Sequence, residues 1–448
     1  MEKYTYKDCG IEWLGKIPKH WETKRLFNIC EFIRGNSGFE KNDLLSEGKY
    51  VALQYGKTYK VEEVNEKFQY YVNENFYKSS QIVNYGDVLF VSTSETMEDL
   101  GHSVFYNRND IGLIGGEQIL LKPNKNILDG KYLFYASKVF GNGLKKFATG
   151  IKVFRFDVYD LKTIYISLPK PKEQKAIAEY LDKATAKIDR IIAIKQEQLM
   201  KMEASLGKKV NEIIKRGVKD FELKESRKDF IGKIPIHYKV QKLKHITTKI
   251  TDGAHFTPNY LDNPDKNSIP FLRVTDVQVE KIDLNKTKFI DVEEHNELIK
   301  RCNPEKGDLL LSKNGTIGIT KVVDWDWDFS IFVSLCLIKP DRQLNVDYLN
   351  YFFKSEIMDF QIKNGSKQIT VTNLHLDKIR DFYIVTPPIS EQEQIVKRLK
   401  DIEFKFNDSL KNIKSQIETL QAYRKSLIHE CVTGKKQVTS AIKTKAYA

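Results

Sequence analysis

The stretch that decides the fold is GKIPKHW at residues 15–21, because it returns as GKIPIHY at residues 232–238, 217 positions later. A second motif, Glu-Gln at residues 173–174, returns at residues 391–392, 218 positions later. Both copies of this motif are followed by isoleucine and leucine at helical spacing. A repeat of this length determines the architecture more firmly than any local propensity. The chain is therefore predicted to be two copies of one unit, related by an approximate two-fold axis.

Each copy begins with a globular segment, in which short runs of aromatic and β-branched residues lie between turn residues. Such runs predict strands, and the clearest are residues 88–92, 118–122, 163–168, 309–312, 332–339 and 381–385. Residues 129–140 and 346–363 are predicted to form helices. The expected fold class is α+β, with two globular domains of mixed strands and helices.

Each copy ends in a long helix that begins after a proline, Pro169 in the first copy and Pro387 in the second. Apolar residues then recur every three or four positions, over residues 177–213 and 395–431, a spacing typical of a coiled coil. About forty residues give a rod of roughly 60 Å, and so narrow an apolar stripe needs a partner. We expect the two helices to form an antiparallel coiled coil that separates the two domains. The alternative is that each helix packs on its own domain.

These elements divide the chain into five segments. They are a first globular domain at residues 1–168, a central long helix at 169–217, a second globular domain at 218–386, a C-terminal long helix at 387–434 and a tail at 435–448. Arg424 is the one strongly polar residue on the apolar seam of the second helix.

The composition favours some classes of protein and excludes others. The 448 residues include 73 Lys and Arg against 60 Asp and Glu, and the net charge of +13 favours polyanionic partners. The five cysteines never have CxxC spacing, which argues against a disulfide framework or a zinc cluster and fits a reducing cytosol. No apolar stretch is long enough to span a membrane, and neither long helix has the continuous basic face of a membrane-surface helix. We expect a soluble, unprocessed, cytoplasmic protein.

The usual signatures of catalysis are missing. The sequence has no GxxxxGK[ST] loop for a nucleoside triphosphate, no GxGxxG turn for a dinucleotide or adenosyl cofactor, and no nuclease arrangement of acidic residues. TPPI at residues 386–389 has the wrong residue on each side of its prolines for an adenine-methylation signature. The eight histidines are dispersed, so no metal site is expected. The acidic run DWDWD at residues 324–328 could hold a cation, but an exposed hairpin tip with aromatic anchors is the favoured interpretation.

Several motifs, in this order along the chain, resemble the specificity subunit of type I DNA restriction-modification systems. They are WLGKIP at residues 13–18, GDLLLSKNG at residues 307–315 and a proline four residues before each Glu-Gln pair. The second domain also resembles a known type of target-recognition domain, through TDGAHFTP at residues 251–258 and IPFLRV at residues 269–274. The first long helix departs from the family pattern, because Lys170 stands where the family often has a second proline.

The resemblance implies a noncatalytic specificity subunit that reads double-stranded DNA and holds no cofactor itself. Two modification subunits would carry S-adenosylmethionine and methylate adenine at N6, and restriction (motor-nuclease) subunits, where present, would use ATP and Mg²⁺. Two unlike domains should read the two halves of a bipartite asymmetric target, while the helix pair sets the spacer and docks the modification subunits. The rival hypotheses are a non-enzymatic coiled-coil scaffold whose domains bind proteins, and an enzyme fused to its own reader, which the missing signatures disfavour.

The residues expected to contact DNA lie in loops that combine cations with groups able to read base edges. Phosphates require Lys or Arg, while base edges require Arg, Lys, Asn, Gln, Ser or Thr. The candidates in the first domain are Gln54, Tyr55, Lys57, Tyr59, Ser92, Thr93, Ser94, Lys145, Lys146, Lys152 and Arg155. Those in the second domain are Thr251, Asp252, His255, Thr257, Arg273, Lys313, Asn314, Thr316, Lys367, Gln368, Thr372 and Asn373. No residue is expected to be catalytic or to bind a metal.

Overall fold

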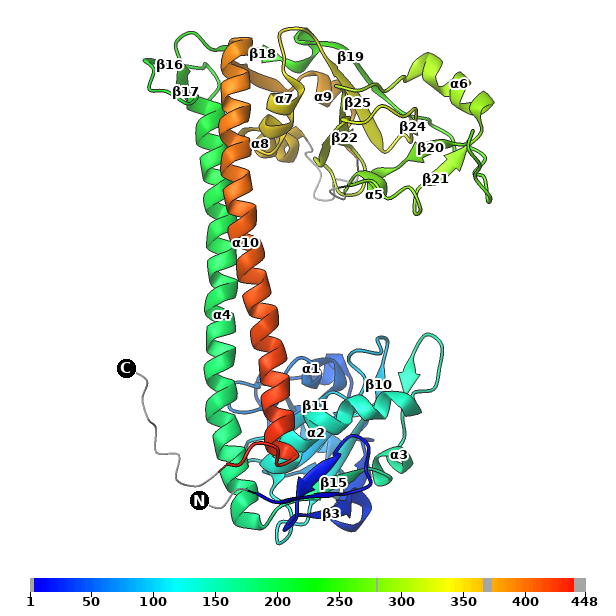
Figure 1. The fold of residues 1–448 in the computed structure, drawn as a ribbon, viewed down its shortest axis with the longest axis vertical. Coiled ribbons are helices and arrows are strands. Elements are labelled where there is room, and N and C mark those ends of the chain that lie inside the picture. Colours follow the sequence, from blue (N-terminus) through cyan, green and yellow to red (C-terminus); the bar gives the residue numbers. More distant parts are fainter. Residues whose placement is uncertain (1–3, 279–280, 366–372, 439–448) are drawn as a thin grey trace. The chain divides into compact units, whose positions relative to one another are not determined.

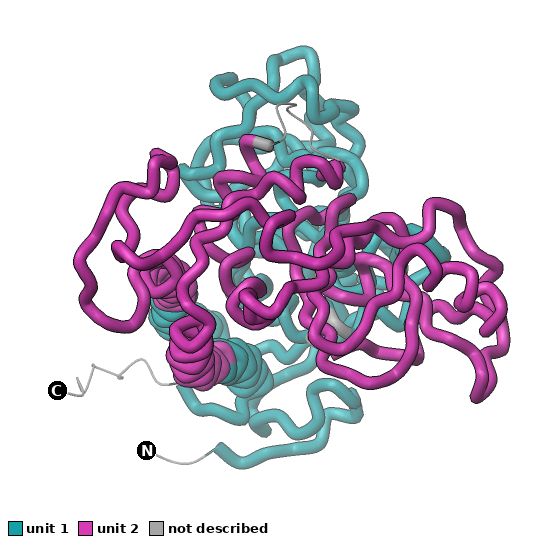
Figure 2. The backbone as a smooth tube through the Cα atoms, turned by 90° about the horizontal axis from the view of Figure 1, so that it is seen from above, with its two compact units in different colours: residues 1–195, 415–448 teal, residues 196–414 magenta. Residues whose placement is uncertain are grey.

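The computed structural model describes residues 4–278, 281–365 and 373–438. The chain forms two compact units, the first containing residues 1–195 and 415–448 and the second residues 196–414 (Figure 2). Each unit holds one globular domain together with part of each long helix. The predicted α+β class, with two domains of mixed strands and helices, is confirmed.

Two sheets form the core of the first domain. The larger has the order β4-β13-β9-β11-β6 and is antiparallel except between β11 and β6, and the smaller has the order β7-β5-β12-β8. Their strands are β4 (Cys30–Arg34), β5 (Tyr50–Leu53), β6 (Glu63–Val64), β7 (Tyr71–Val72), β8 (Ile82–Val83), β9 (Val88–Val91), β11 (Ser103–Tyr106), β12 (Gly112–Ile114) and β13 (Gln118–Pro123). Shorter pairs join β1 (Tyr6–Asp8) to β2 (Lys16–Pro18), β3 (Glu22–Arg25) to β15 (Tyr165–Leu168), and β10 (Thr93–Ser94) to β14 (Phe154–Arg155). The helices are α1 (Tyr55–Thr58), α2 (Gly130–Leu144), which packs on the larger sheet, and α3 (Val158–Lys162).

The second domain is built in a similar way. A four-stranded sheet has the order β19-β25-β22-β23, and a three-stranded sheet has the order β21-β20-β24. Their strands are β19 (Thr247–Asp252), β20 (Ile269–Leu272), β21 (Lys288–Ile290), β22 (Leu309–Ser312), β23 (Thr320–Val322), β24 (Ser330–Ile331) and β25 (Leu335–Pro340). Shorter pairs join β16 (Leu223–Glu225) to β17 (Lys233–Pro235) and β18 (Lys239–Lys242) to β26 (Tyr383–Thr386). The helices are α5 (Val274–Val277), α6 (Val292–Arg301), α7 (Val346–Phe353), α8 (Glu356–Gly365) and α9 (Leu376–Arg380).

The six predicted strands are present, with ends displaced by at most three residues. The single helix predicted over residues 346–363 is wrong in one respect, because α7 and α8 are separate helices. Ser355 lies at the break, where its hydroxyl donates to the carbonyl of Phe352 at 2.6 Å and accepts a bond from the Met358 amide at 3.4 Å. A serine that bonds nearby backbone groups in this way favours a helix end over a helix interior.

The repeated motifs contact each other within each unit. His20, from the first GKIPxH motif, lies 3.2 Å from the carboxylate of Glu173 at the start of the first long helix. The corresponding atoms of His237 and Glu391 in the second unit are 2.8 Å apart. The motifs therefore join the start of each domain to the start of the helix that follows it, and the internal repeat is confirmed.

The glutamine of each Glu-Gln motif is fully buried and makes the same three hydrogen bonds in both units. Gln392 accepts from the amide of Asn345 at 2.8 Å and donates to the carbonyls of Gln343 and Pro387 at 2.8 and 2.9 Å. Gln174 bonds the corresponding backbone groups, the Asp129 amide and the carbonyls of Ile127 and Pro169. A buried amide that is completely hydrogen-bonded in this way fixes the start of each long helix against its domain.

The long helices are α4 (Pro171–Arg216) and α10 (Ile389–Val432) (Figure 1). In the first unit Asp189 of α4 pairs with Arg424 of α10, and Lys195 bonds Gln416. The residue numbers thus rise on one helix as they fall on the other, so the pair is antiparallel. The predicted coiled coil is confirmed.

The two helices also pair in the second unit, where the Lys209 ammonium group lies 5.5 Å from the ring centre of Phe406. The alternative of separate helices, each packed only on its own domain, is therefore wrong. Within the described ranges, no helix is both long and apolar enough to cross a membrane.

Arg424, the polar residue on the seam, is held by two carboxylates. Its Nε lies 2.9 Å from Oδ1 of Asp189 on α4, and one terminal nitrogen lies 2.7 Å from Oε2 of Glu62 in the first domain. A single polar residue on an apolar seam favours one register of the two helices. Arg424 therefore fixes both the register of the helix pair and its attachment to the first domain.

Candidate nucleic-acid interface

Several predicted segments of the first domain lie around Glu117, a residue that is not among the predicted DNA contacts. Thr93 of β10 pairs with Arg155 of β14, and the Thr93 hydroxyl donates to the Glu117 carboxylate. Burial raises the pKa of Tyr55, and the carboxylates near its phenol, including that of Glu117, raise it further. The predicted segments at residues 54–59 and 92–94, and the predicted Arg155, thus lie close to Glu117. Glu117 could not be predicted from the sequence, because its contact with Thr93 joins residues 24 positions apart.

The exposed members of this surface are cations and an aromatic ring. Tyr59, Lys146, Lys152 and Arg155 are exposed, while Gln54, Tyr55, Lys57 and Lys145 are half-buried. The rings of Tyr55 and Tyr59 stack with their centres 5.7 Å apart. By contrast, the predicted contacts Ser92, Thr93 and Ser94 are only 5, 8 and 4% exposed. Because these three residues are buried, they support the surface in this conformation, and the Thr93 hydroxyl does so by donating to the Glu117 carboxylate.

The predicted cations Lys152 and Arg155 lie on a narrow turn. Thr149 and Arg155 form a β-bridge that closes the turn, with hydrogen bonds of 2.9 Å in both directions. Ile151 is 95% exposed at its tip, next to Lys152. An apolar tip between cations suits entry into a groove of DNA, where phosphates flank apolar base surfaces.

The predicted residues of the second domain gather around Asp252, at the end of β19. His255 Nε2 lies 3.0 Å from one carboxylate oxygen, which also accepts a bond from Arg301, and Lys313 Nζ lies 3.1 Å from the other. Burial raises the pKa of Asp252, but the bonds from His255 and Lys313 outweigh burial and hold this pKa below its ordinary value. Asp252 is therefore an anion at neutral pH that positions the side chains of His255, Arg301 and Lys313.

Accessibility divides these residues into two groups. Asp252 and Lys313 are only 3 and 5% exposed, so they form a buried ion pair that supports the surface. His255 and Thr257 are exposed and Thr251 is half-buried, so their side chains are available to a ligand.

The remaining predicted residues of this domain lie on neighbouring loops. Arg273 pairs with Asp276 at 3.1 Å, Asn314 forms a β-bridge with Asn373, and Thr316 is exposed. Oδ1 of Asn314 is buried and has no hydrogen-bond partner within the described part of the chain. The predicted contacts Lys367, Gln368 and Thr372 lie outside the described residues.

A basic hollow next to Asp252 contains no residue on the predicted list except Thr251. Its volume is about 440 Å³, and its four cations are Lys244, Lys249, Arg301 and Arg380. Arg380 donates to the carbonyl of Ile250 at 3.0 Å, which holds it against β19. Four cations around one concave surface suit the binding of phosphate groups. The hollow could not be predicted from the sequence because these residues come from three separate segments.

The two candidate surfaces have the same backbone plan. The pair Thr93–Arg155 in the first domain corresponds to Asn314–Asn373 in the second, since each joins the end of a central strand to the segment before α3 or α9. Gly35 and Gly253 are also equivalent, being 218 positions apart. A Cβ atom on either would lie within 2 Å of a carbonyl oxygen, 1.8 Å at Gly35 and 1.9 Å at Gly253. The same close backbone contact thus shapes both domains.

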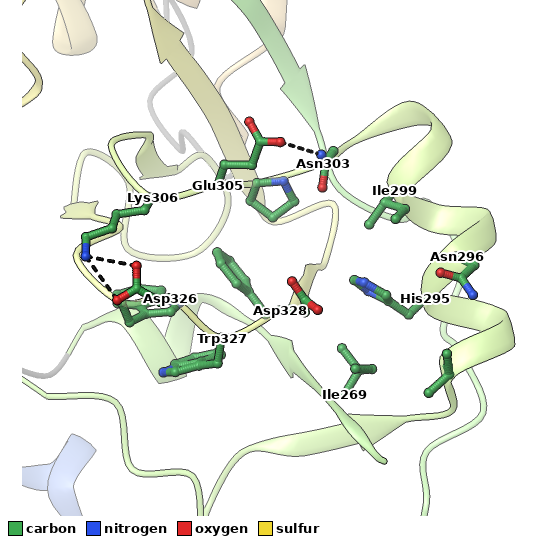
Figure 3. Close-up of a pocket in the computed structure, with 14 residues that line it drawn as sticks. Ile269, His295, Asn296, Ile299, Asn303, Glu305, Lys306, Asp326, Trp327 and Asp328 are labelled. Carbon is green, nitrogen blue, oxygen red and sulfur yellow. Dashed lines mark hydrogen bonds and ion pairs between the residues drawn. The ribbon is translucent and has the colours of Figure 1, made fainter. Parts of the chain in front are cut away.

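The acidic run at residues 324–328 borders a separate hollow of about 450 Å³ (Figure 3). Trp325 and Trp327 stack with their ring centres 5.0 Å apart and pack on the core, while Lys306 pairs with Asp326 at 2.9 Å. The aromatic anchors are therefore confirmed. The hairpin is wrong, because β23 and β24 belong to different sheets and the run connects them. Among the described residues, no group of three or more His, Cys, Asp or Glu is placed to hold a metal ion.

This chain belongs to the type I restriction-modification DNA specificity family. The family's domain, described as "Type I restriction modification DNA specificity domain", matches twice, at residues 18–201 and 235–419. The two matches coincide with the two copies of the repeat, so the predicted resemblance is confirmed.

Individual relatives agree with this assignment along nearly the whole chain. The MjaVIII specificity subunit of Methanocaldococcus jannaschii is 25% identical over 434 residues, covering 94% of each chain. The EcoKI specificity subunit of Escherichia coli K12 is 23% identical, covering 94% of this chain and 90% of its own. A solved structure, described as the basis of complex assembly and conformational transition of the type I R-M system, has a TM-score of 0.69 at 16% identity. It covers 94% of this chain and 99% of its own and supports the fold.

Proposed function

We propose that this specificity subunit reads a bipartite, asymmetric DNA target, with one half read by each globular domain. One observation supports this most directly. The two domains place different side chains, Thr93 with Arg155 and Asn314 with Asn373, on equivalent backbone positions. Similar frames with unlike side chains suit the reading of unlike half-sites. Because the two-fold relation is only approximate and lies within one chain, it does not require a palindromic target.

In this proposal the chain is a noncatalytic subunit, and its partner subunits catalyse the reactions. Two modification subunits dock on the helix pair, bring S-adenosylmethionine and methylate adenine at N6 after flipping it from the duplex. Restriction subunits, where present, bring ATP-driven and Mg²⁺-dependent cleavage. The antiparallel helices set the spacer between the half-sites. The complex acts in the cytoplasm, where it meets genomic DNA.

The test is to co-express the chain with a modification subunit of the same system and to map methyladenine across the host genome. We expect a motif of two short, unlike half-sites separated by an unspecified spacer of constant length. Methylation without such a motif, or no methylation together with stable protein partners of the two domains, would favour the scaffold hypothesis.

The basic hollow of the second domain provides a quantitative prediction. Lys249→Ala should weaken binding to all DNA sequences alike and reduce the slope of log K against log salt by about 0.9, because one phosphate contact is lost. Binding titrations between low and moderate salt measure this slope. Lys306→Ala is the matched control, because Lys306 lies at the other hollow, next to the acidic run at residues 324–328. This variant should leave the slope unchanged. An altered base preference in Lys249→Ala would contradict a role limited to phosphate contact.

A further inference from the structure

The backbone of Glu117 adopts a conformation that non-glycine residues rarely use. Its φ is +62°, and among the described residues only Arg227 is another non-glycine residue with positive φ. Glu117 follows Gly115 and Gly116 in the turn between β12 and β13. A side chain in the left-handed region costs stability, and such strain often occurs at functional sites. Glycine would relieve the strain at Glu117, so the glutamate needs another explanation.

The surroundings hold the Glu117 side chain at the recognition surface. Its backbone carbonyl accepts from the Ser92 amide at 3.2 Å, and its Oε2 accepts from the Thr93 hydroxyl. Its Oε1 accepts no hydrogen bond from the described residues, and the side chain is exposed. Thr93 is paired in turn with Arg155. One carboxylate oxygen is therefore fixed and the other is available, beside the strand pair that carries the exposed Arg155.

A carboxylate at this place suits only one kind of DNA group. Phosphates repel it, so it contributes nothing to general affinity. It can accept a hydrogen bond from an exocyclic amino group of a base, cytosine N4 or adenine N6, which are the donors on base edges in the major groove. Thr93 fixes the carboxylate before DNA arrives, which lowers the entropic cost of that bond.

We propose that Glu117 is a base-reading residue of the first domain, whose carboxylate accepts a hydrogen bond from an exocyclic amino group in the first half-site. The inference rests on the proposed function and adds the chemical group that is read. The corresponding position in the second domain is Ser334, whose carbonyl accepts from the Lys313 amide at 2.9 Å as that of Glu117 accepts from Ser92. The same backbone position thus carries a carboxylate, which only accepts, in one domain and a hydroxyl, which can also donate, in the other, and this difference suits unlike half-sites.

The experiment uses the complete complex with modification subunits, first as wild type and then with Glu117→Gln. The neutral amide keeps the shape of the side chain but loses the charge and one acceptor. We expect discrimination at one position of the first half-site to fall roughly tenfold or more, with the second half-site unchanged. The relaxed position is a cytosine or an adenine in the wild-type motif, and its identity shows which amino group is read.

Glu117→Gly separates reading from support of the fold. Glycine suits a positive φ, so the unfolding midpoint of the Glu117→Gly variant should equal or exceed that of wild type. Base discrimination should fall at the same position of the DNA motif as in Glu117→Gln. An unchanged motif in both variants, or relaxation accompanied by loss of stability in Glu117→Gly, would overturn the inference while the wild-type motif still supports the proposed function. Absence of a bipartite motif in wild type would overturn the proposed function, and this inference with it.

Discussion

Replacing Gln392 with leucine is expected to lower the free energy of unfolding of the second unit by about 3 kcal/mol or more. The side chain is fully buried and bonds the Asn345 amide and the carbonyls of Gln343 and Pro387. Leucine fills a similar volume, excludes water and satisfies none of these groups, and each buried polar group left without a partner costs about 1–3 kcal/mol. Urea denaturation together with hydrogen exchange of peptides from residues 223–386 measures the loss.

A matched control lies two residues further along the same helix. Gln394 is exposed, so Gln394→Leu should change the free energy by no more than about 0.5 kcal/mol. The repeat offers a second comparison, because Gln174→Leu removes the same three bonds in the first unit. In the Gln174→Leu variant, hydrogen exchange should increase in peptides from residues 6–168. Equal stability of Gln392→Leu and Gln394→Leu would refute the assigned role of the buried amide.

The two-copy organisation and the helix pair were predictable because they depend on local or repeated sequence patterns. Apolar residues at intervals of three and four predict a helix that packs on a second helix. The offsets of the two repeated motifs, 217 and 218 positions, indicated two copies of one unit. The partners of those motifs were not predictable. Nothing in the sequence shows that His20 contacts Glu173, because their contact joins residues 153 positions apart. The break at Ser355 was also missed, since it depends on side-chain bonds to the backbone.

The types of residue in the candidate DNA-binding surfaces were predictable from the sequence, but their exact positions were not. Residue chemistry identified loops with cations and hydrogen-bonding groups, and the structure places several of these together. Which ones reach the surface depends on partners distant in sequence: Lys313 is buried because Asp252, on another strand, neutralises it. The basic hollow around Lys249 and the carboxylate of Glu117 depend equally on tertiary packing. The predicted contacts with DNA remain predictions.

Replacing Asp252 with alanine is expected to abolish reading of the second half-site and to destabilise the second unit by about 3–5 kcal/mol. The Lys313 ammonium group, with a side chain only 7% exposed, would lose its carboxylate partner, and breaking a buried ion pair by removing one partner costs about this much. His255 and Arg301 would lose the oxygen that orients them at the surface. Methyladenine mapping with the complex measures the loss of reading, and urea denaturation measures the loss of stability. The first half-site of the methylated motif should be unchanged.

The double variant Asp252→Ala with Lys313→Met distinguishes loss of reading from loss of folding. Methionine removes the unpaired charge, and replacing both members of a buried ion pair by apolar groups is often neutral or stabilising. Stability should therefore return to within about 1 kcal/mol of wild type. Reading of the second half-site should stay lost, because His255 and Arg301 still lack the carboxylate that positions them. If the double variant regains the wild-type motif, then Asp252 serves only to neutralise Lys313, and the exposed donors around it read no bases.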